Sequence, residues 1–312
     1  MLSCEVSRLP IESVEYVWMD GEFVKWDEAR VHIMTHSLHY GTAVFEGIRG
    51  YSVDNNVHVF RLKDHIRRLY NSARIYLMDI PYSKDEFADT VVGLIKKNSI
   101  RRNCYIRPLV FRGVGEFGLN PFGSPVHSAI ITFPLGAYLK EGGVRVCTSS
   151  WRRIPDECMP SFAKTSGAYA NSILAKIEAT KAGFDEAILL DTRGHLGEGS
   201  GENVFLVRDG QIYTPTLSSS ILEGITRRSV LEIAKNEGIK IVEASLLKSE
   251  LYICDEAFFT GTAAEITPIL EIDHRKIGDG KPGPVASMFK EKFSKIAQGK
   301  QKKYRHWLTP VY

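Results

Sequence analysis

Long hydrophobic runs are missing from this sequence. No stretch of about 18 apolar residues occurs, and a membrane-spanning helix needs roughly that length. The most apolar segment, residues 129–139, is interrupted by Thr132, Pro134 and Gly136. The first 12 residues contain two glutamates, an arginine and a proline, so they lack the unbroken apolar core of a signal peptide. These absences argue against membrane insertion and secretion, and we expect the protein in the cytoplasm.

Cysteine is also scarce. The chain has five cysteines, an odd number, and none are spaced as C-x-x-C. They are Cys4, Cys104, Cys147, Cys158 and Cys254. A disulfide framework is therefore not expected. We interpret these residues as mostly buried free thiols in a reducing compartment, and a single redox-active pair is the alternative.

An excess of charge of one sign is absent too. Lysine and arginine total 40 and aspartate and glutamate total 37, which leaves a net charge of +3. This balance gives no electrostatic basis for binding nucleic acid or a membrane surface. With 44% hydrophobic and 25% charged residues, the composition is ordinary for a soluble globular protein. At roughly 150 residues per domain, the 312 residues predict about two domains.

Short strands and helices alternate in the first part of the chain. Two strand-like runs flank Asp20 and Gly21, a pair typical of a type I′ hairpin turn. Residues 62–76 place apolar side chains on one helical face. Ser83, followed three residues later by Glu86, forms a capping-box pattern that predicts a helix running to about residue 98. Further strands are predicted at residues 58–60, 105–111 and 129–133.

The second part of the chain repeats this alternation. A strand is predicted over residues 144–148, and a helix follows in which Ala170, Ile173, Leu174 and Ile177 share helical spacing. Later strands are predicted at residues 187–190, 203–207, 211–213, 240–242 and 257–259, with a helix from about residue 226 to before residue 238. Interleaved hairpins and helices predict an α+β fold, with two α/β domains and mostly antiparallel sheets.

One segment has the composition of an interdomain linker. Residues 134–143 contain one proline and three glycines. We therefore predict a small N-terminal domain over residues 1–133, this linker, and a larger C-terminal domain over residues 144–312.

Three patterns resemble known sites without the context that those sites need. Residues 113–118 match G-x-G-x-x-G, but prolines and a glycine follow where a dinucleotide site needs a helix. The spacing of His32, His36 and His39 fits metal ligation, yet no second ligand set supports it, and a structural loop is the favoured interpretation. The basic residues at 299–303 are most simply a solvated terminus.

Four other features together match the needs of pyridoxal phosphate. Lys164 lies between a proline-containing loop and a helix, and supplies an amine. Glu198 lies among alternating glycines, where a carboxylate would meet a cationic ring nitrogen. Residues 224–226 open a helix with a glycine and a hydroxyl, a suitable anion site. Residues 261–264 offer a second backbone cradle of small residues. Each feature alone is weak.

These segments carry a specific resemblance. The chain is similar to fold-type IV (class IV) pyridoxal-phosphate enzymes and, among these, to the branched-chain amino-acid aminotransferases. The similarity runs from about residue 16 to about residue 283. The segments that carry it are residues 39–49, 105–108, 159–169, 197–205, 224–227 and 261–268. Several long motifs in one order make a chance match improbable.

The resemblance implies a role for each cofactor-binding residue. Lys164 would hold pyridoxal phosphate covalently and then move the proton between the substrate α-carbon and the cofactor. Glu198 would pair with the pyridine nitrogen, Tyr169 with the 3′-oxygen, and Arg68 with the phosphate. The remaining cofactor contacts implied by the resemblance are Leu222, Gly224, Ile225, Thr226, Gly261 and Thr262.

The substrate site is implied in the same way. Tyr105 and Arg107 alternate along a predicted strand, so both face one side, and the resemblance associates them with carboxylate recognition. The other implied substrate contacts are Tyr40, Phe45, Gly47, Arg49, Tyr138, Thr262, Ala263 and Ala264. Leu135 stands where some family members have tryptophan, which leaves the range of substrates open.

The implied reaction is a two-step amino transfer. An L-leucine, L-isoleucine or L-valine gives its amino group to the cofactor, which then aminates 2-oxoglutarate to glutamate, with ping-pong kinetics. The alternatives within the fold are a D-amino-acid or amine transaminase and aminodeoxychorismate lyase. A cofactor-binding protein without turnover is a further alternative. The resemblance also implies a homodimer or a larger assembly, either a dimer of dimers or a hexamer, in which residues 115–120 reach the neighbouring subunit.

Overall fold

The computed structural model describes residues 11–136, 139 and 142–312, which form two compact units. The N-terminal unit contains Ile11–Gly136, Ala163–Tyr169 and Lys295–Tyr312. The C-terminal unit contains the described part of residues 137–162 together with Ala170–Ser294. The division after residue 136 falls in the predicted linker. The grouping of residues 163–169, with Lys164, and of residues 295–312 in the N-terminal unit differs from the predicted continuous division.

Hydrogen bonds explain this grouping. The backbone N–H of Phe45 donates to the carbonyl oxygen of Lys164 at 3.0 Å, and Val44 forms an antiparallel bridge with Thr165. Strand β17 (Leu308–Pro310) pairs with β5 (Asn56–Phe60) at the edge of the first sheet. Such long-range pairing leaves no local signal in the sequence.

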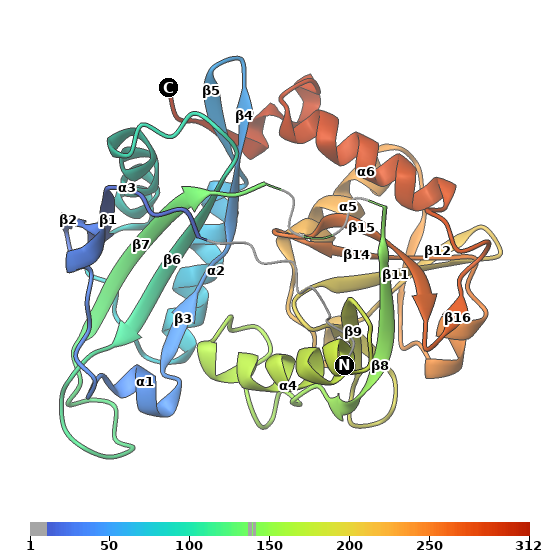
Figure 1. The fold of residues 1–312 in the computed structure, drawn as a ribbon, viewed down its shortest axis with the longest axis horizontal. Coiled ribbons are helices and arrows are strands. Elements are labelled where there is room, and N and C mark those ends of the chain that lie inside the picture. The colour runs from blue at the N-terminus through green and yellow to red at the C-terminus, as the bar shows by residue number, and fades with distance from the viewer. Residues whose placement is uncertain (1–10, 137–138, 140–141) are drawn as a thin grey trace. The chain divides into compact units, whose positions relative to one another are not determined.

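The N-terminal unit is built on an antiparallel sheet with the strand order β17-β5-β4-β6-β7-β1-β2, and β3 pairs with β6 (Figure 1). The strands not yet given are β1 (Tyr16–Met19), β2 (Glu22–Lys25), β3 (Ala43–Phe45), β4 (Ile48–Val53), β6 (Cys104–Arg112) and β7 (Val126–Pro134). The unit also contains α1 (His36–Tyr40), α2 (Leu62–Ile75) and α3 (Lys84–Lys97), with short 3-10 helices at Trp26–Glu28, Ser166–Ala168 and Lys302–Trp307.

Local chemistry sets several of these elements. Asp20 and Gly21 have φ values of 48° and 101°, as a type I′ turn between β1 and β2 requires. Ser83 Oγ accepts from Glu86 N at 3.2 Å while Glu86 Oε2 accepts from Ser83 N at 2.7 Å, which confirms the capping box of α3. The buried faces of α2 and α3 pack with sheet residues in one core cluster.

The C-terminal unit contains a mixed sheet with the order β10-β9-β8-β15-β14-β11-β12-β13, and β16 pairs with β15. Only the pairs β12–β13, β15–β8 and β8–β9 are parallel among the described strands. Its strands are β8 (Val144–Arg152), β9 (Glu186–Leu190), β10 (Leu196–Gly199), β11 (Asn203–Arg208), β12 (Gln211–Pro215), β13 (Ile241–Ala244), β14 (Glu256–Gly261), β15 (Glu265–Ile272) and β16 (Arg275–Lys276). Its helices are α5 (Ile225–Asn236) and most of α4 (Tyr169–Lys181) and α6 (Pro284–Ala297), with 3-10 helices at Leu217–Ser219 and Lys248–Tyr252. The first residue of α4 and the last three residues of α6 belong to the N-terminal unit. Mostly antiparallel pairing confirms the predicted α+β class.

Helix α4 is confirmed, but the apolar residues that predicted it do not face the sheet. Ile173, Leu174 and Ile177 are exposed. The buried residues of the helix are small, and they are Ser172, Ala175 and Ala179. Ala175 and Ala179 pack with Ala187 and Leu189 of β9. Small side chains let the helix approach the sheet closely, so its larger apolar side chains lie on the outer face.

The structure also bears on the predictions for residues 113–118, the basic residues near position 300, the cysteines and membrane-spanning helices. No helix follows residues 113–118, which agrees with the rejected dinucleotide site. Lysines 300, 302 and 303 are exposed, but the chain beyond them is ordered and ends in β17. Four cysteines are described and all are free; Cys158 is exposed and the other three are buried. No helix in the described part of the chain is long and apolar enough to cross a membrane.

Candidate active site

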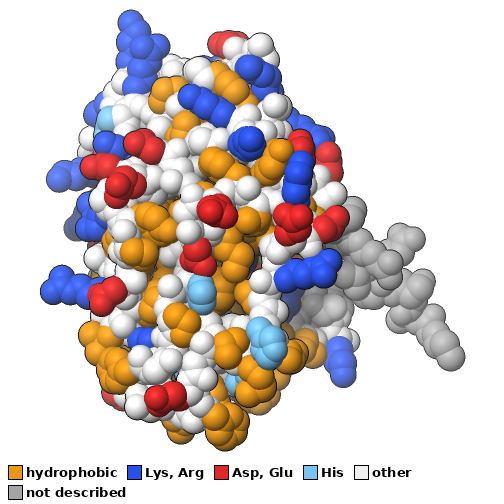
Figure 2. All heavy atoms as spheres, turned by 90° about the vertical axis from the view of Figure 1, so that its left-hand side faces the viewer, with side chains coloured by type: hydrophobic (Ala, Val, Ile, Leu, Met, Phe, Trp, Pro, Cys, Tyr) orange, Lys and Arg blue, Asp and Glu red, His pale blue; other side chains and the backbone are white. Residues whose placement is uncertain are grey.

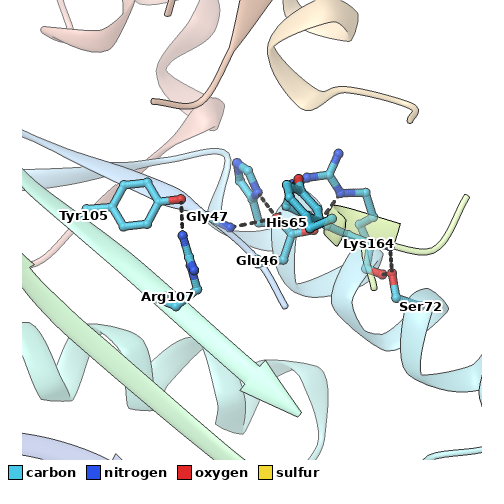
Figure 3. A network of polar contacts seen from close by, with 9 residues as sticks. Glu46, Gly47, His65, Ser72, Tyr105, Arg107 and Lys164 are labelled. Atoms are coloured by element: carbon cyan, nitrogen blue, oxygen red, sulfur yellow. Dashed lines mark hydrogen bonds and ion pairs between the residues drawn. The ribbon is translucent and has the colours of Figure 1, made fainter. Parts of the chain in front are cut away.

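Lys164 lies in a short segment that is held at both its backbone and its side chain. Its backbone N–H donates to Ser72 Oγ at 3.0 Å, and the same hydroxyl donates to the Arg68 carbonyl oxygen at 2.9 Å. Its Nζ donates to the hydroxyl of Tyr169, five residues further on. The structure therefore brings the predicted lysine and tyrosine together. It also fixes the lysine backbone to helix α2 through Ser72 (Figure 3).

The same Nζ lies over aromatic rings. It is 5.0 Å from the ring centroid of Phe45 and 4.9 Å from that of Tyr169. The two rings are 4.9 Å apart. The faces of aromatic rings attract cations, so the ammonium form of Lys164 is accommodated here as well as the neutral amine.

Glu46 is the centre of a buried polar network in the same unit (Figure 3). It is fully buried and accepts from His65 Nδ1 at 2.7 Å. Arg68 donates to it through Nε at 2.6 Å and through Nη2 at 2.9 Å. Burial alone would raise the pKa of Glu46. The Arg68 guanidinium and His65 outweigh this effect and hold that pKa well below its usual range.

This network places Arg68, the predicted phosphate ligand, beside a permanent negative charge. The paired contacts with Glu46 fix the plane of the guanidinium. Burial lowers the pKa of His65, so its imidazole is neutral and donates one hydrogen bond to Glu46. Neither Glu46 nor His65 was predicted as a site residue. The signal that could have found Glu46 is its position inside the motif at residues 39–49.

Tyr105 and Arg107 point toward each other from β6 (Figure 3). Arg107 Nη2 donates to the Tyr105 hydroxyl at 3.1 Å. The guanidinium of Arg107 also lies 4.8 Å from the ring centroid of Phe45. A Cβ atom at Gly47 would lie 2.0 Å from the Tyr105 hydroxyl, so only glycine leaves room for this tyrosine. These four predicted substrate residues therefore form one cluster.

The other predicted substrate residues of this unit have different surroundings. Arg49 is buried, and its Nη1 donates to the Gly136 carbonyl oxygen at 3.0 Å. In the pairing of β4 with β6, Arg49 stands directly opposite Tyr105, so its backbone borders the cluster. Tyr40 is exposed at the end of α1. Tyr138 lies outside the described residues.

His36 and His39 make hydrogen bonds to hydroxyl and carbonyl oxygens, and His36 also contacts the Gly118 carbonyl oxygen. His36 Nδ1 is 2.7 Å from Thr42 Oγ1, and His39 Nε2 is 2.9 Å from the Ile33 carbonyl oxygen. This is the arrangement expected of a structural loop. No group of three metal-ligating side chains occurs in the part of the chain that the structure describes.

Glu198, the predicted partner of the ring nitrogen, is buried in the C-terminal unit. Arg153 Nη2 lies 2.9 Å from its Oε1. Asn203 Nδ2 donates to its Oε2 at 2.9 Å, and the backbone N–H of Leu222 donates to the same atom at 3.1 Å. These donors favour the carboxylate form, which is the form that accepts a hydrogen bond from a protonated ring.

Sequence reasoning missed Arg153 and Asn203. Asn203 follows the glycine-rich segment directly, so that motif was an available signal. Arg153 is 45 positions before Glu198 and no local pattern marks it.

The predicted phosphate cradle is the N-terminus of α5. Gly224 is its N-cap residue, with no side-chain cap, and Ile225 and Thr226 lie buried in the first turn. A Cβ atom at Gly224 would lie 1.9 Å from Asn203 Oδ1, so glycine is required there. The first backbone N–H groups of a helix lack partners inside it and attract anions. Gly261 is the last residue of β14, and residues 262–264 form the turn to β15, with Ala264 buried.

The donor sets fit pyridoxal phosphate. Lys164, Tyr169 and Arg68 lie in the N-terminal unit, where they offer an amine, a phenol and a guanidinium. Glu198 and the N-terminus of α5 lie in the C-terminal unit, where they offer a carboxylate and backbone N–H groups. Each chemical group that the cofactor needs is present in one of these two sets.

The comparisons with known proteins agree with the fold. Residues 43–272 match the model of the amino-transferase class IV family. The chain belongs to the class IV aminotransferases. Over nearly its whole length it is similar to branched-chain-amino-acid aminotransferases. The relative from Pseudomonas aeruginosa is 45% identical, over 95% of this chain and 97% of that protein.

Solved structures give the same result. The branched-chain aminotransferase of Thermoproteus uzoniensis, determined with norvaline, has a TM-score of 0.93 and 46% identity, covering 96% of this chain and 100% of that chain. The T.th. enzyme, complexed with N-(5′-phosphopyridoxyl)-L-glutamate, has a TM-score of 0.92 and 46% identity, covering 96% and 99%. The resemblance stated from the sequence and the fold it implied are confirmed.

Proposed function

We propose that this protein transfers the amino group of L-leucine, L-isoleucine or L-valine to 2-oxoglutarate, with pyridoxal phosphate as cofactor. The observation that carries the proposal is the pairing of Lys164 Nζ with the Tyr169 hydroxyl. The similarity to branched-chain enzymes solved with norvaline and with phosphopyridoxyl-glutamate supports both the amino donor and the amino product.

The cofactor, when bound, supplies an aldehyde that joins an amine and a pyridine ring that withdraws electrons from the substrate α-carbon. Lys164 supplies the amine that holds it. With substrate in place of this amine, the free Nζ would move the proton between the substrate α-carbon and the C4′ atom of the cofactor. Tyr169 keeps Nζ oriented through its hydroxyl.

The other predicted cofactor residues include two charged side chains, each oriented by its neighbours. Glu198, oriented by Arg153 and Asn203, would accept a hydrogen bond from the ring nitrogen and favour its protonated form. In the N-terminal unit, Arg68, oriented by Glu46, would donate to the phosphate. In the C-terminal unit, the backbone N–H groups at residues 224–226 and the small residues at 261–262 offer donors of the same kind. Fixed donors and acceptors of this kind need no rearrangement during the reaction.

Substrate recognition combines apolar and cationic groups. Phe45 offers an aromatic wall to a branched side chain, while Arg107 and Tyr105 offer charge and a hydroxyl to the side-chain carboxylate of 2-oxoglutarate. The backbone at Ala263 and Ala264 binds the α-carboxylate. An apolar surface with a few well-placed polar groups accommodates both substrates in turn.

Initial-rate kinetics test this function. L-leucine and 2-oxoglutarate varied against each other should give parallel double-reciprocal lines, because one site serves both substrates in turn. Intersecting lines would contradict the shared site. A preference for D-leucine, for amines without a carboxylate, or release of pyruvate from aminodeoxychorismate would replace the proposed substrate class.

Self-association is also part of the proposal. Apolar side chains are exposed along residues 31–40 and 114–122 of the N-terminal unit, and Phe117 and Leu119 are 89% and 80% exposed. His36 joins the two segments, with Nε2 at 3.1 Å from the Gly118 carbonyl oxygen. Figure 2 draws the side of the protein that is at the left of Figure 1, and hydrophobic side chains gather at its lower end. A patch of this kind is typical of an interface, and we assign it to a second copy of the chain in a homodimer or larger assembly.

The cysteine chemistry supports a reducing compartment. Cys104, Cys147 and Cys254 are buried free thiols, and burial raises the pKa of each, to about 11, 11 and 12. Thiols held in the neutral form react slowly, as expected of structural residues. We place the protein in the cytoplasm on this basis.

A further inference from the structure

Glu202 is an acidic side chain that is buried with few polar contacts. It is 6% exposed, and its Oε2 accepts one hydrogen bond, from the backbone N–H of Gly201 at 3.1 Å. No lysine or arginine among the described residues forms an ion pair with it. A buried carboxylate normally requires such a partner.

Two neighbouring carboxylates of the C-terminal unit each have a cationic partner. Lys176 Nζ lies 2.6 Å from Oε2 of Glu186, which is almost fully buried on β9. Arg153 Nη2 lies 2.9 Å from Oε1 of Glu198 on β10. Three carboxyl groups therefore share one region of the C-terminal unit, and among these described groups Glu202 is the one without a cation.

The backbone is shaped to hold the Glu202 side chain. The N–H of Gly199 donates to the Glu202 carbonyl oxygen at 2.6 Å, which closes the turn between β10 and β11. A Cβ atom at Gly199 would lie 2.8 Å from Glu202 Oε2, and one at Gly261 would lie 3.3 Å from its Cγ. Both glycines leave space for this carboxyl, and both lie in segments assigned above to cofactor binding.

The protonation state follows from these surroundings. Burial raises the pKa of Glu202, and the negative charges of Glu186 and Glu198 raise it further, to about 8. The Gly201 N–H and Lys176 act in the opposite direction and are outweighed. At neutral pH the folded protein therefore holds Glu202 as an uncharged acid.

We propose that Glu202 is a positioning residue that acts as a neutral carboxylic acid, so that Glu198 is the carboxylate that meets the cofactor ring. This inference rests on the role of Glu198 proposed above. An ionised Glu202 would add a further negative charge to those of Glu186 and Glu198, which act on it electrostatically. The amino transfer therefore weakens when the Glu202 proton is lost at alkaline pH.

Substitution by glutamine tests the neutral state directly, because an amide has the shape of the acid but cannot ionise. In the wild-type protein, infrared spectroscopy should show a protonated carboxyl band at neutral pH that disappears above about pH 8. Glu202→Gln should lack that band. The same band in both proteins, or none in the wild type, would overturn the proposal.

Thermal unfolding of the cofactor-free protein gives a second readout that needs no activity. The folded-state pKa is raised, so stability is greatest below the unfolded pKa and falls as pH rises toward about 8. The unfolding midpoint of Glu202→Gln should fall less with pH than that of the wild type. Glu256→Gln is the matched control for the substitution itself, because this buried glutamate accepts from two backbone N–H groups away from Glu198.

The pH profile of the holoenzyme connects Glu202 to the reaction. Wild-type kcat should fall above about pH 8. Glu202→Ala should lower kcat more than it changes KM, whereas Glu202→Gln should restore kcat and remove the fall near pH 8. An unchanged fall in Glu202→Gln would overturn the proposal while leaving the proposed function intact. If the wild type showed no transamination, the infrared and unfolding results would still decide the state of Glu202.

Discussion

The backbone N–H of Lys164 donates to Ser72 Oγ at 3.0 Å, and that hydroxyl donates in turn to the Arg68 carbonyl oxygen at 2.9 Å. One serine on α2 thus joins the backbone of the cofactor lysine to the backbone of the phosphate arginine. Because Ser72 is fully buried, the relationship is shielded from water.

Removal of this hydroxyl should weaken cofactor binding. Ser72→Ala leaves the Lys164 N–H without its acceptor, which costs about 1–3 kcal/mol for a buried donor. We expect a lower free energy of unfolding by about that amount and a weaker affinity for pyridoxal phosphate, measured by denaturant titration and by fluorescence. Ser128→Ala is the control, because the Ser128 hydroxyl is buried without a partner. Equal losses in the two variants would contradict the role of Ser72.

Neutralising Glu46 should have a larger effect. Glu46→Gln leaves the half-buried Arg68 beside an uncharged amide, and breaking a buried ion pair costs roughly 3–5 kcal/mol. We expect weaker binding of pyridoxal phosphate, because Arg68 is no longer held in plane, and a lower free energy of unfolding at neutral pH.

The pH dependence of that effect has a defined sign. The folded-state pKa of Glu46 is lowered, so its contribution is present above the unfolded value near 4.5 and is lost as pH falls below it. Acid titration of stability should therefore be steeper in the wild type than in Glu46→Gln. Parallel curves would contradict this prediction, because they would show that the charge of Glu46 does not contribute to the free energy of unfolding.

Gly47 should not tolerate a side chain. In Gly47→Ala the new methyl would lie 2.0 Å from the Tyr105 hydroxyl, so Tyr105 must move away from Arg107. We expect KM for 2-oxoglutarate to rise at least tenfold, equivalent to about 1.4 kcal/mol, with a smaller change for L-leucine. Gly93→Ala is the control. Gly93 lies inside α3, and a methyl group there would be in ordinary contact with Phe23, at 3.7 Å. That variant should be as active as the wild type and slightly more stable.

The apolar patch should control assembly. Phe117→Ser with Leu119→Ser removes two of its most exposed side chains. We expect a smaller mass by light scattering and a loss of activity that increased protein concentration partly restores. Ile253→Ser, on an exposed residue of the C-terminal unit, should leave the mass unchanged. A wild-type protein that is monomeric at high concentration would contradict this assignment.

Features set by neighbouring residues were predictable from the sequence. The hairpin turn at Asp20 and Gly21 has positive φ at both positions, and α3 begins with its predicted capping box. The aminotransferase motifs were also predictable as candidates, since their residue types are those the cofactor needs. The pairing of Lys164 with Tyr169 follows from a spacing of five residues across the start of a helix.

Features set by distant residues were not predictable. Arg153 reaches Glu198, and Ser72 reaches Lys164, across 45 and 92 positions. The orientation of α4 was also not predictable. Its large apolar residues share one face, but small residues on the opposite face are the ones that pack on the sheet. The edge strand at residues 308–310 pairs with a strand almost 250 positions earlier and carries no local pattern.

The most direct test of the central claim is the near-visible absorption spectrum of the purified protein, before and after addition of L-leucine without any oxo acid. The proposed function predicts a band of cofactor linked to Lys164 that disappears while the band of the aminated cofactor grows. Lys164→Ala should lack the first band even with pyridoxal phosphate added. A wild-type protein that develops no such band with added pyridoxal phosphate would contradict the role of Lys164 and the function built on it.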